Sequence, residues 1–351
     1  MDLTSAQAQF SASGTFLNTA SLGLPPRQTV DVVRATIERW SRGEHNAPDF
    51  DEAVDRSRAL YAELVSTPAA EVALGSQTSQ LIGHIAANLR DDAQVLVAEG
   101  EFTSGLFPFL AQQQRGVRVR EVPMADLPGE INDDTTAVVS SAVQSADGAL
   151  LDLDAVQDAC DATGAMSVID VTQAAGWLPI DASRFDVTVC SGYKWLLAPR
   201  GTAFLTVKPW VRAGMLVHSA SWAGGADKWA SVYGTPLRLA SDARSLDVSP
   251  AWFCWVGQVP ALELLRDVGI AQIHRHNVDL ANAFLAEIGE PAGHSAIVSV
   301  AVDDAAADAL QAADVQCAMR AGRLRVSFHL YNTDADAARV ADVVRPYLLD
   351  Q

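Results

Sequence analysis

Short apolar runs alternate with amphipathic stretches through the middle of the chain. Residues 187–190 form a run typical of a buried strand, and residues 152–162 place apolar side chains with helical period. Strands that alternate with helices predict βαβ units and a mostly parallel sheet. The turn signal at residues 199–201 favours one antiparallel edge strand. The predicted strands are 95–98, 117–122, 137–143, 167–170, 187–190 and 203–207.

The pattern changes after about residue 245. A long helix is predicted over 251–268 and ends at Gly269. Strands at 296–302, 315–319 and 323–330 and an amphipathic helix at 334–349 then follow. We therefore predict a large α/β domain over 15–245 and a smaller α+β domain over 246–351, which residues 1–14 join.

Charge and cysteine usage restrict the function classes. The 351 residues include 43 Asp and Glu against 25 Lys and Arg, a net charge of −18 that repels nucleic acids and anionic membranes. The four cysteines form no CxxC pair, so neither a zinc site nor a disulfide is expected. No basic leader precedes an apolar run and no stretch is long enough to cross a membrane, so we expect a cytoplasmic protein.

Two charged residues follow predicted buried strands. Lys194 comes after residues 187–190, and Asp170 ends residues 167–170. A buried ammonium loses solvation and its pKa falls, which suits an amine that forms a Schiff base. A buried carboxylate at the same sheet edge would keep the ring nitrogen of pyridoxal 5′-phosphate (PLP) protonated. The alternatives are a lysine that extends to solvent and an aspartate that caps a helix.

Four blocks of sequence carry a resemblance to a known family. They are residues 17–26, 170–181, 191–201 and 325–333, in this order along the chain. Together they resemble the class V aminotransferases among the fold-type I PLP-dependent enzymes, a group that includes cysteine desulfurases, kynureninase and isopenicillin N epimerase-like proteins. The resemblance implies a mostly parallel seven-stranded sheet with a smaller α+β C-terminal domain, and a homodimer with active sites at the subunit interface.

The resemblance assigns roles around the PLP ring. Lys194 would hold PLP as a Schiff base and move protons at the substrate α-carbon. Asp170 would pair with the pyridine nitrogen, and Gln173 would hydrogen-bond the phenolic oxygen. Phe102 would stack on the ring, unless it is an ordinary core aromatic.

The phosphate requires several donors, and a helix N-terminus supplies them. Residues 75–79 precede a predicted helix at 80–89, and the resemblance places phosphate contacts at Gln77 and Thr78. Ser191 and Tyr193 add hydroxyl groups, and Ser249 would reach the phosphate from the partner subunit. Thr78 could instead belong to a helix-capping cluster.

Arg325 is the candidate residue for binding the substrate carboxylate, because a guanidinium binds a carboxylate through two parallel hydrogen bonds. The resemblance adds Asn18 to the substrate-binding residues, whereas Arg325 could also be a surface arginine. The sequence departs from the family at Trp177, where histidine is frequent, and near Ser145, where an asparagine is usual. Cys317 lies in a predicted strand, so its thiol is expected to be buried rather than placed on the mobile loop of a desulfurase.

These features predict an enzyme that acts on the α-amino group of an amino acid by aminotransferase-type chemistry. A carbon–sulfur lyase that works by β-elimination is the main alternative. An amino-acid epimerase and a non-catalytic PLP-fold binding protein are further alternatives. Neither a metal, a nucleic acid nor a membrane is expected as a partner.

Overall fold

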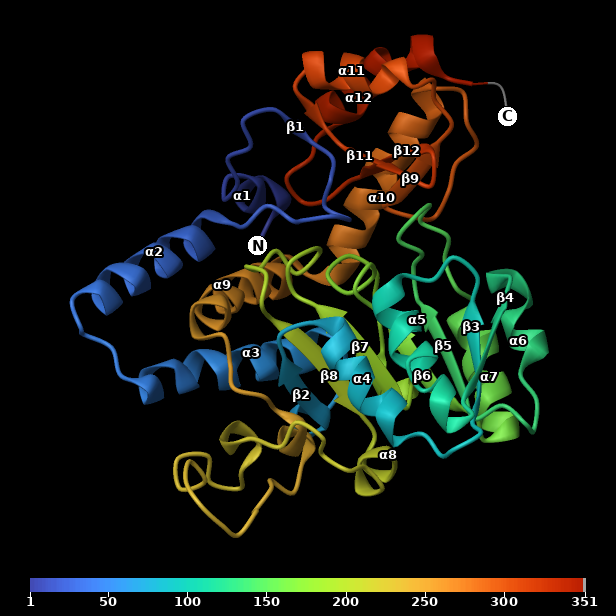
Figure 1. Cartoon of the computed structure of the whole chain (residues 1–351). Coiled ribbons are helices and arrows are strands. Elements are labelled where there is room, and N and C mark those ends of the chain that lie inside the picture. Colours follow the sequence, from blue (N-terminus) through green and yellow to red (C-terminus); the bar gives the residue numbers. More distant parts are fainter. Residues whose placement is uncertain (350–351) are drawn as a thin grey trace.

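The computed structural model describes residues 1–349, and its centre is a seven-stranded sheet (Figure 1). The strand order is β2-β8-β7-β6-β5-β3-β4, and β8 is antiparallel to both of its neighbours. The strands are β2 (Val72–Gly75), β3 (Gln94–Ala98), β4 (Arg118–Val122), β5 (Ala137–Ser141), β6 (Met166–Asp170), β7 (Val187–Ser191) and β8 (Ala203–Val207).

The predicted strands are confirmed to within a few residues, with two corrections. The antiparallel strand β8 lies inside the sheet and not at its edge. The edge on that side is β2, a four-residue strand that the sequence pattern did not predict, and β4 forms the opposite edge.

Alternating side chains of the sheet enter two hydrophobic layers. Leu96 and Ile169 face one layer, and Val97 and Val168 face the other. The helices of this part of the chain are α2 (Arg27–Ser41), α3 (Asp51–Leu64), α4 (Thr78–Asn88), α5 (Thr103–Leu110), α6 (Leu127–Glu130), α7 (Leu153–Thr163) and α8 (Pro209–Ala213).

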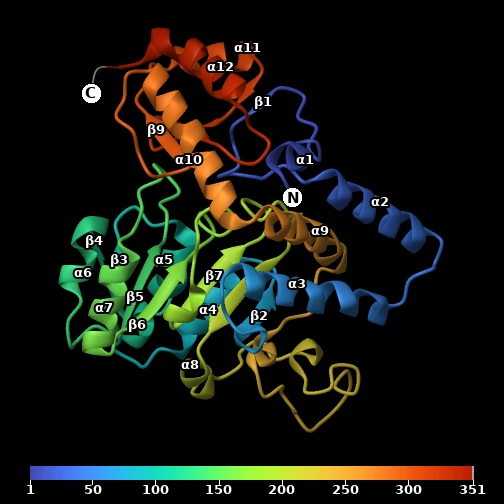
Figure 2. The ribbon, with the colours of Figure 1, turned by 180° about the vertical axis from the view of Figure 1, so that it is seen from behind.

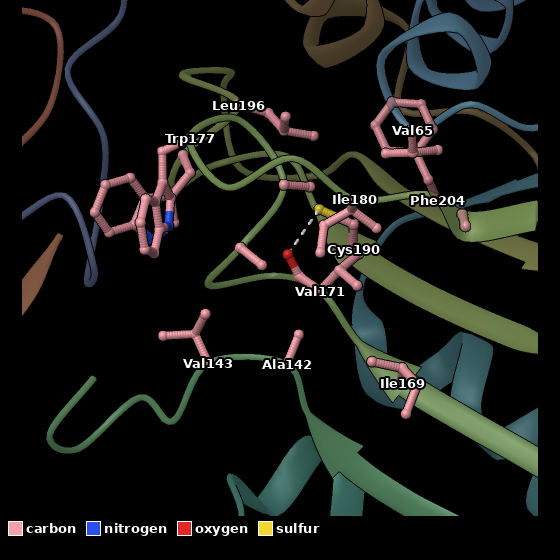
Figure 3. Close-up of a cluster of buried hydrophobic side chains, with 14 of the residues drawn as sticks. Val65, Ala142, Val143, Ile169, Val171, Trp177, Ile180, Cys190, Leu196 and Phe204 are labelled. Atoms are coloured by element: carbon pink, nitrogen blue, oxygen red, sulfur yellow. Dashed lines mark hydrogen bonds between the residues drawn. The ribbon is translucent and has the colours of Figure 1, made fainter. Parts of the chain in front are cut away.

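The first layer continues beneath the ends of the central strands. Figure 3 shows Cys190 among Ile169, Ile180, Leu196 and Phe204, with its thiol directed at the carbonyl of Val171. All are buried. This apolar packing supports the turns that follow β6 and β7.

The C-terminal part forms a second, smaller body above the sheet in Figure 1 and again in the reverse view of Figure 2. A three-stranded sheet, in the order β11-β12-β9, packs on helices there. Its elements are α9 (Trp252–Val268), α10 (Ile270–Glu287), β9 (Ile297–Val300), α11 (Ala305–Ala312), β10 (Val315–Gln316), β11 (Ala318–Arg320), β12 (Arg323–Ser327) and α12 (Asp334–Val344).

The N-terminal segment joins this body. It contains α1 (Leu3–Gln7) and β1 (Thr15–Phe16), and β1 pairs in parallel with β10. The single strand predicted over 315–319 is wrong, because β10 and β11 are separate strands with different partners. The boundary at residue 245 stays a prediction, since α9 packs on α2 and α3 of the large part, and residues 350–351 lie outside the described chain. Within residues 1–349, no helix combines the length and the apolar character that a membrane crossing requires.

Candidate active site

The carboxyl ends of the parallel strands enclose a cavity of about 490 Å³. Strands β6 and β7 end at Asp170 and Ser191, and the chain places Lys194 three residues after β7. Open parallel sheets bind ligands at this edge. The cavity is lined by Ser76, Gln77, Thr78, Ser79, Phe102, Thr103, Ser104, Ser141, Ser145, Asp170, Thr172, Gln173, Ser191, Tyr193, Lys194, Arg200 and Gly201.

Lys194 is a buried amine that lines this cavity. Its Nζ lies 5.2 Å from the ring centroid of Phe102 and 5.7 Å from that of Tyr193. Burial lowers the Lys194 pKa to about 8, although the negative charge of Asp170 opposes this shift. The side chain is buried, so the alternative of a lysine that extends to solvent is wrong.

Asp170 is a buried carboxylate. Its Oδ1 accepts a hydrogen bond of 2.7 Å from the backbone N–H of Thr172, which closes a turn and caps no helix. Loss of solvation raises the Asp170 pKa, while the Thr172 hydrogen bonds and the charge of Lys194 lower it. Within residues 1–349, Asp170 forms no ion pair shorter than 4 Å, so a cationic N–H group in the cavity would complete its environment.

Glu101 is a second buried carboxyl group, which sequence reasoning had not singled out. Its Oε1 accepts hydrogen bonds from Phe102 N at 2.7 Å and from Ser141 Oγ at 2.5 Å, and its Oε2 accepts one from Ser141 N at 2.5 Å. Burial raises the Glu101 pKa to about 7, and the charge of Asp170 adds to the shift. Glu101 thereby joins the start of α5 to the end of β5.

Hydroxyl groups and a helix N-terminus form another wall of the cavity. The helix α4 begins at Thr78, whose Oγ1 lies 2.7 Å from Ser191 Oγ. Gln77 is the N-cap, yet its side chain makes no capping hydrogen bond. The first N–H groups of an eleven-residue helix and two hydroxyl groups thus face one region, an arrangement that suits a phosphate group.

Phe102 lines the cavity with 46% of its surface exposed, so the interpretation as an ordinary core aromatic is wrong. Tyr193 is half-buried beside Arg200, whose guanidinium carbon lies 5.0 Å from the tyrosine ring centroid. Arg200 was not predicted as a cavity residue. Two aromatic rings therefore flank the amine of Lys194.

Gln173 and Arg325 meet at Ser145. The Gln173 Nε2 donates to Ser145 Oγ at 3.2 Å, and Arg325 Nη1 donates to the Ser145 carbonyl at 2.5 Å. Arg325 is 2% exposed, so the alternative of a surface arginine is wrong. Burial lowers its pKa to about 10, and among residues 1–349 it has no carboxylate partner within 4 Å. It lies behind Ser145 and does not itself line the cavity.

Two predicted residues lie elsewhere. Asn18 bridges to Ser327 and lines a separate groove beside Cys317. Ser249 is exposed on the loop before α9. Their proposed contacts with substrate and with a partner's phosphate group stay predictions.

Cys317 lies between β10 and β11, and is half-buried rather than fully buried as expected. Burial raises its thiol pKa to about 11. Only Ala321 and Gly322 separate β11 from the strand that carries Arg325, so no long loop connects the thiol to the site.

Comparisons with known proteins identify the family of this chain. The sequence model of the family described as Aminotransferase class-V matches residues 26–319. The aminotransferase YcbU of Bacillus subtilis, itself uncharacterised, is 24% identical over 336 residues, which are 89% of this chain and 90% of that protein. The kynureninase of Deinococcus radiodurans is 28% identical over 315 residues, which are 81% and 73% of the two chains.

Solved structures share the fold. The cysteine desulfurase CsdA of Escherichia coli superposes with a TM-score of 0.83 at 20% identity and covers 98% of this chain and 97% of its own. The cystine C-S lyase C-DES, solved with cysteine persulfide, gives a TM-score of 0.84 at 17% identity over 94% and 98% of the two chains. These likenesses establish a fold-type I architecture.

Proposed function

This chain belongs to the class V aminotransferase family of PLP-dependent enzymes, and from that premise we propose that it takes a proton from the α-carbon of an amino acid and transfers the amino group. One observation supports this most strongly. A buried amine and a buried carboxylate, Lys194 and Asp170, line the cavity. Immediately behind its wall lies the buried cation of Arg325, which has no carboxylate partner within 4 Å among residues 1–349.

The residues of the cavity fit PLP. Lys194 would hold the cofactor covalently, and Asp170, which forms no ion pair within 4 Å among residues 1–349, would pair with its pyridine N–H. The hydroxyl groups of Thr78 and Ser191 and the α4 N-terminus would hold the phosphate, with Phe102 over the ring. When bound, PLP supplies an electron sink for the α-carbon bond that breaks.

The chain's own groups then perform the proton transfer. The lowered pKa of Lys194 leaves a useful fraction of neutral amine near neutral pH, which is the form that accepts the α-proton. Arg325 would exchange its contact with the Ser145 carbonyl for the substrate carboxylate, which fixes the orientation of the α-carbon. Asp170 would keep the ring nitrogen protonated while charge develops.

A β-elimination that releases a sulfur leaving group is the second candidate. If the substrate carries sulfur, the half-buried position of Cys317 favours β-elimination over persulfide chemistry. Burial raises the thiol pKa to about 11, and such a thiol is a weak nucleophile near neutral pH. Elimination requires no protein thiol. The products would then be pyruvate, ammonia and a sulfide.

The deciding experiment is a panel of amino acids incubated with the holoenzyme, with and without a 2-oxo acid acceptor. Transamination yields a new keto acid and an aminated acceptor. Pyruvate with ammonia and sulfide identifies β-elimination, and loss of optical purity alone identifies epimerisation. An absorbance spectrum that no amino acid alters identifies a binding protein. The Lys194→Ala variant is the negative control, and borohydride reduction of wild type should place the pyridoxyl group on Lys194 and not on Lys208 or Lys228.

A further inference from the structure

Ser145 stands between the residue predicted to bind the cofactor and the residue predicted to bind the substrate. It lies in the loop after β5 and lines the cavity together with Lys194. Its Oγ accepts hydrogen bonds from Gln173 Nε2 at 3.2 Å and from Arg325 Nη1 at 3.3 Å. Neither donor can accept a hydrogen bond in return.

The orientation of the Gln173 amide is fixed by its neighbours. The indole N–H of Trp195, which can only donate, lies 2.7 Å from Gln173 Oε1. The oxygen must therefore face Trp195, and the NH2 group must face the other way. Trp177 Nε1 also donates to the Gln173 carbonyl at 2.6 Å, which holds the backbone.

Both hydrogens of the Gln173 NH2 group are consequently in use. One is donated to the Ala20 carbonyl at 2.9 Å and the other to Ser145 Oγ. Gln173 is buried, so no solvent replaces these partners. It has no spare donor for a phenolic oxygen in the cavity.

Of these two side chains, Ser145 is the one that keeps a free donor, the hydrogen of its hydroxyl group. Two N–H groups occupy the lone pairs of Oγ, so the O–H bond takes another direction. Within residues 1–349 it has no acceptor. The adjacent guanidinium of Arg325 also makes this hydroxyl group a stronger donor, because hydrogen bonds in a chain polarise one another.

We propose that the Ser145 hydroxyl, and not the Gln173 amide, donates the hydrogen bond to the phenolic oxygen of PLP. Gln173 and Trp195 are then positioning residues that orient this hydroxyl group. The proposal rests on PLP binding, which family membership establishes, and not on the reaction proposed above. It also gives a reason why this chain functions without the asparagine that the family usually has near Ser145.

The test is a pH titration of the visible absorbance of the resting holoenzyme, without amino-acid substrate. A donor at the phenolic oxygen stabilises its negative charge and so lowers the pH midpoint of the bound cofactor. Ser145→Ala should raise that midpoint by about one unit or more and weaken PLP binding in equilibrium dialysis. Ser145→Thr, which keeps the hydroxyl group, should restore both. Ser11→Ala removes an exposed hydroxyl group far along the chain from the cavity residues and should change neither.

Gln173→Met completes a double-mutant cycle. Since Gln173 acts through Ser145, its effect on the midpoint should disappear when Ser145 is already alanine. A midpoint that is unchanged in Ser145→Ala but shifted in Gln173→Met would overturn the proposal, as would additive shifts. Urea unfolding of each apoprotein identifies a variant that merely fails to fold. If Ser145→Ala is such a variant, the comparison of Ser145→Thr with wild type decides the proposal. No readout depends on turnover, so failure of the proposed reaction leaves the result interpretable.

Discussion

At the residue scale, the role proposed for Asp170 concerns a single atom of the cofactor, because its charge would act on the pyridine nitrogen. Asp170→Asn keeps an oxygen that accepts the Thr172 N–H, so the fold and much of the PLP binding should survive. The ring nitrogen should lose its proton and the electron sink should weaken. Exchange of the substrate α-hydrogen in deuterated water should slow at least about a hundredfold. Exchange at the wild-type rate would show that another group protonates the ring.

The buried carboxyl group of Glu101 leads us to predict that the stability of the folded protein depends on pH. Its pKa is about 7 in the folded chain against 4.5 for an ordinary glutamate. Between these values the folded protein keeps a proton that the unfolded protein releases, so stability falls as pH rises through this window. The loss should reach about 3 kcal/mol near pH 7.

The measurement compares urea unfolding of the wild-type and Glu101→Gln apoproteins across this range. Glutamine does not titrate, so the stability difference between the two should change by about 3 kcal/mol in favour of the variant as pH rises. The exposed neighbour Glu99, changed to glutamine, is the matched control and should show no such trend. A difference that stays constant with pH would mean that Glu101 is charged throughout.

Strand ends were the most informative residues of the sequence. Lys194 and Asp170 could be singled out because two opposite charges follow successive apolar strands, and both positions belong to the edge of the sheet where ligands bind. Glu101 and Ser145 could not be singled out, since each acts through hydrogen bonds to segments distant in the sequence. The buried state of Arg325 likewise depends on Ser21 and Ser145, which no local pattern connects to it.

At the scale of elements, the short connection between β11 and β12 has a chemical consequence. It holds Cys317 next to a strand pair, in which Ala318 lies opposite Arg325. A thiol with a pKa of about 11 is a thiolate in about one molecule in ten thousand at pH 7. We therefore predict that Cys317→Ala leaves the rate of product formation from cysteine and cysteine conjugates unchanged.

Product analysis checks this prediction. Any three-carbon product that has lost its sulfur should be pyruvate and not alanine. Cys254→Ala, which removes the other half-buried thiol, serves as the control. Alanine that wild type forms and Cys317→Ala does not would establish a persulfide route.

The errors in the predicted strands of the main sheet have a common cause. The edge strand β2 is only four residues long, and its place is set by pairing with β8, more than a hundred residues later. Its Leu74 N–H also donates to Asp247, which forms a buried ion pair with Arg58 at 2.6 Å. Periodicity within a short window carries no information on such long-range partners. The central parallel strands were predictable because their apolar runs are buried on both faces.

At the scale of the whole molecule, an exposed groove lined mainly by apolar residues lies beside the active site. A groove of about 560 Å³ lies between α2 and the turn at Arg200, and Arg200 also lines the PLP cavity. Helix α2 projects from the body in Figures 1 and 2. Exposed apolar patches of this kind mark association sites. The family resemblance implies a homodimer with active sites at the subunit interface, and we propose that the second copy of the chain covers this groove.

Matched substitutions on one helix test the dimer. Val30 and Ile37 line the groove and are exposed by 37% and 45%, whereas Val32 is 36% exposed on the same helix and does not line it. A charge buried in an apolar interface is costly. The double variant Val30→Glu with Ile37→Glu should therefore sediment as a monomer at concentrations where wild type and Val32→Glu sediment as dimers. Because Arg200 connects groove and cavity, the monomer should also bind PLP more weakly. A monomeric wild type, or equal dimerisation of both variants, would contradict the assignment of this face.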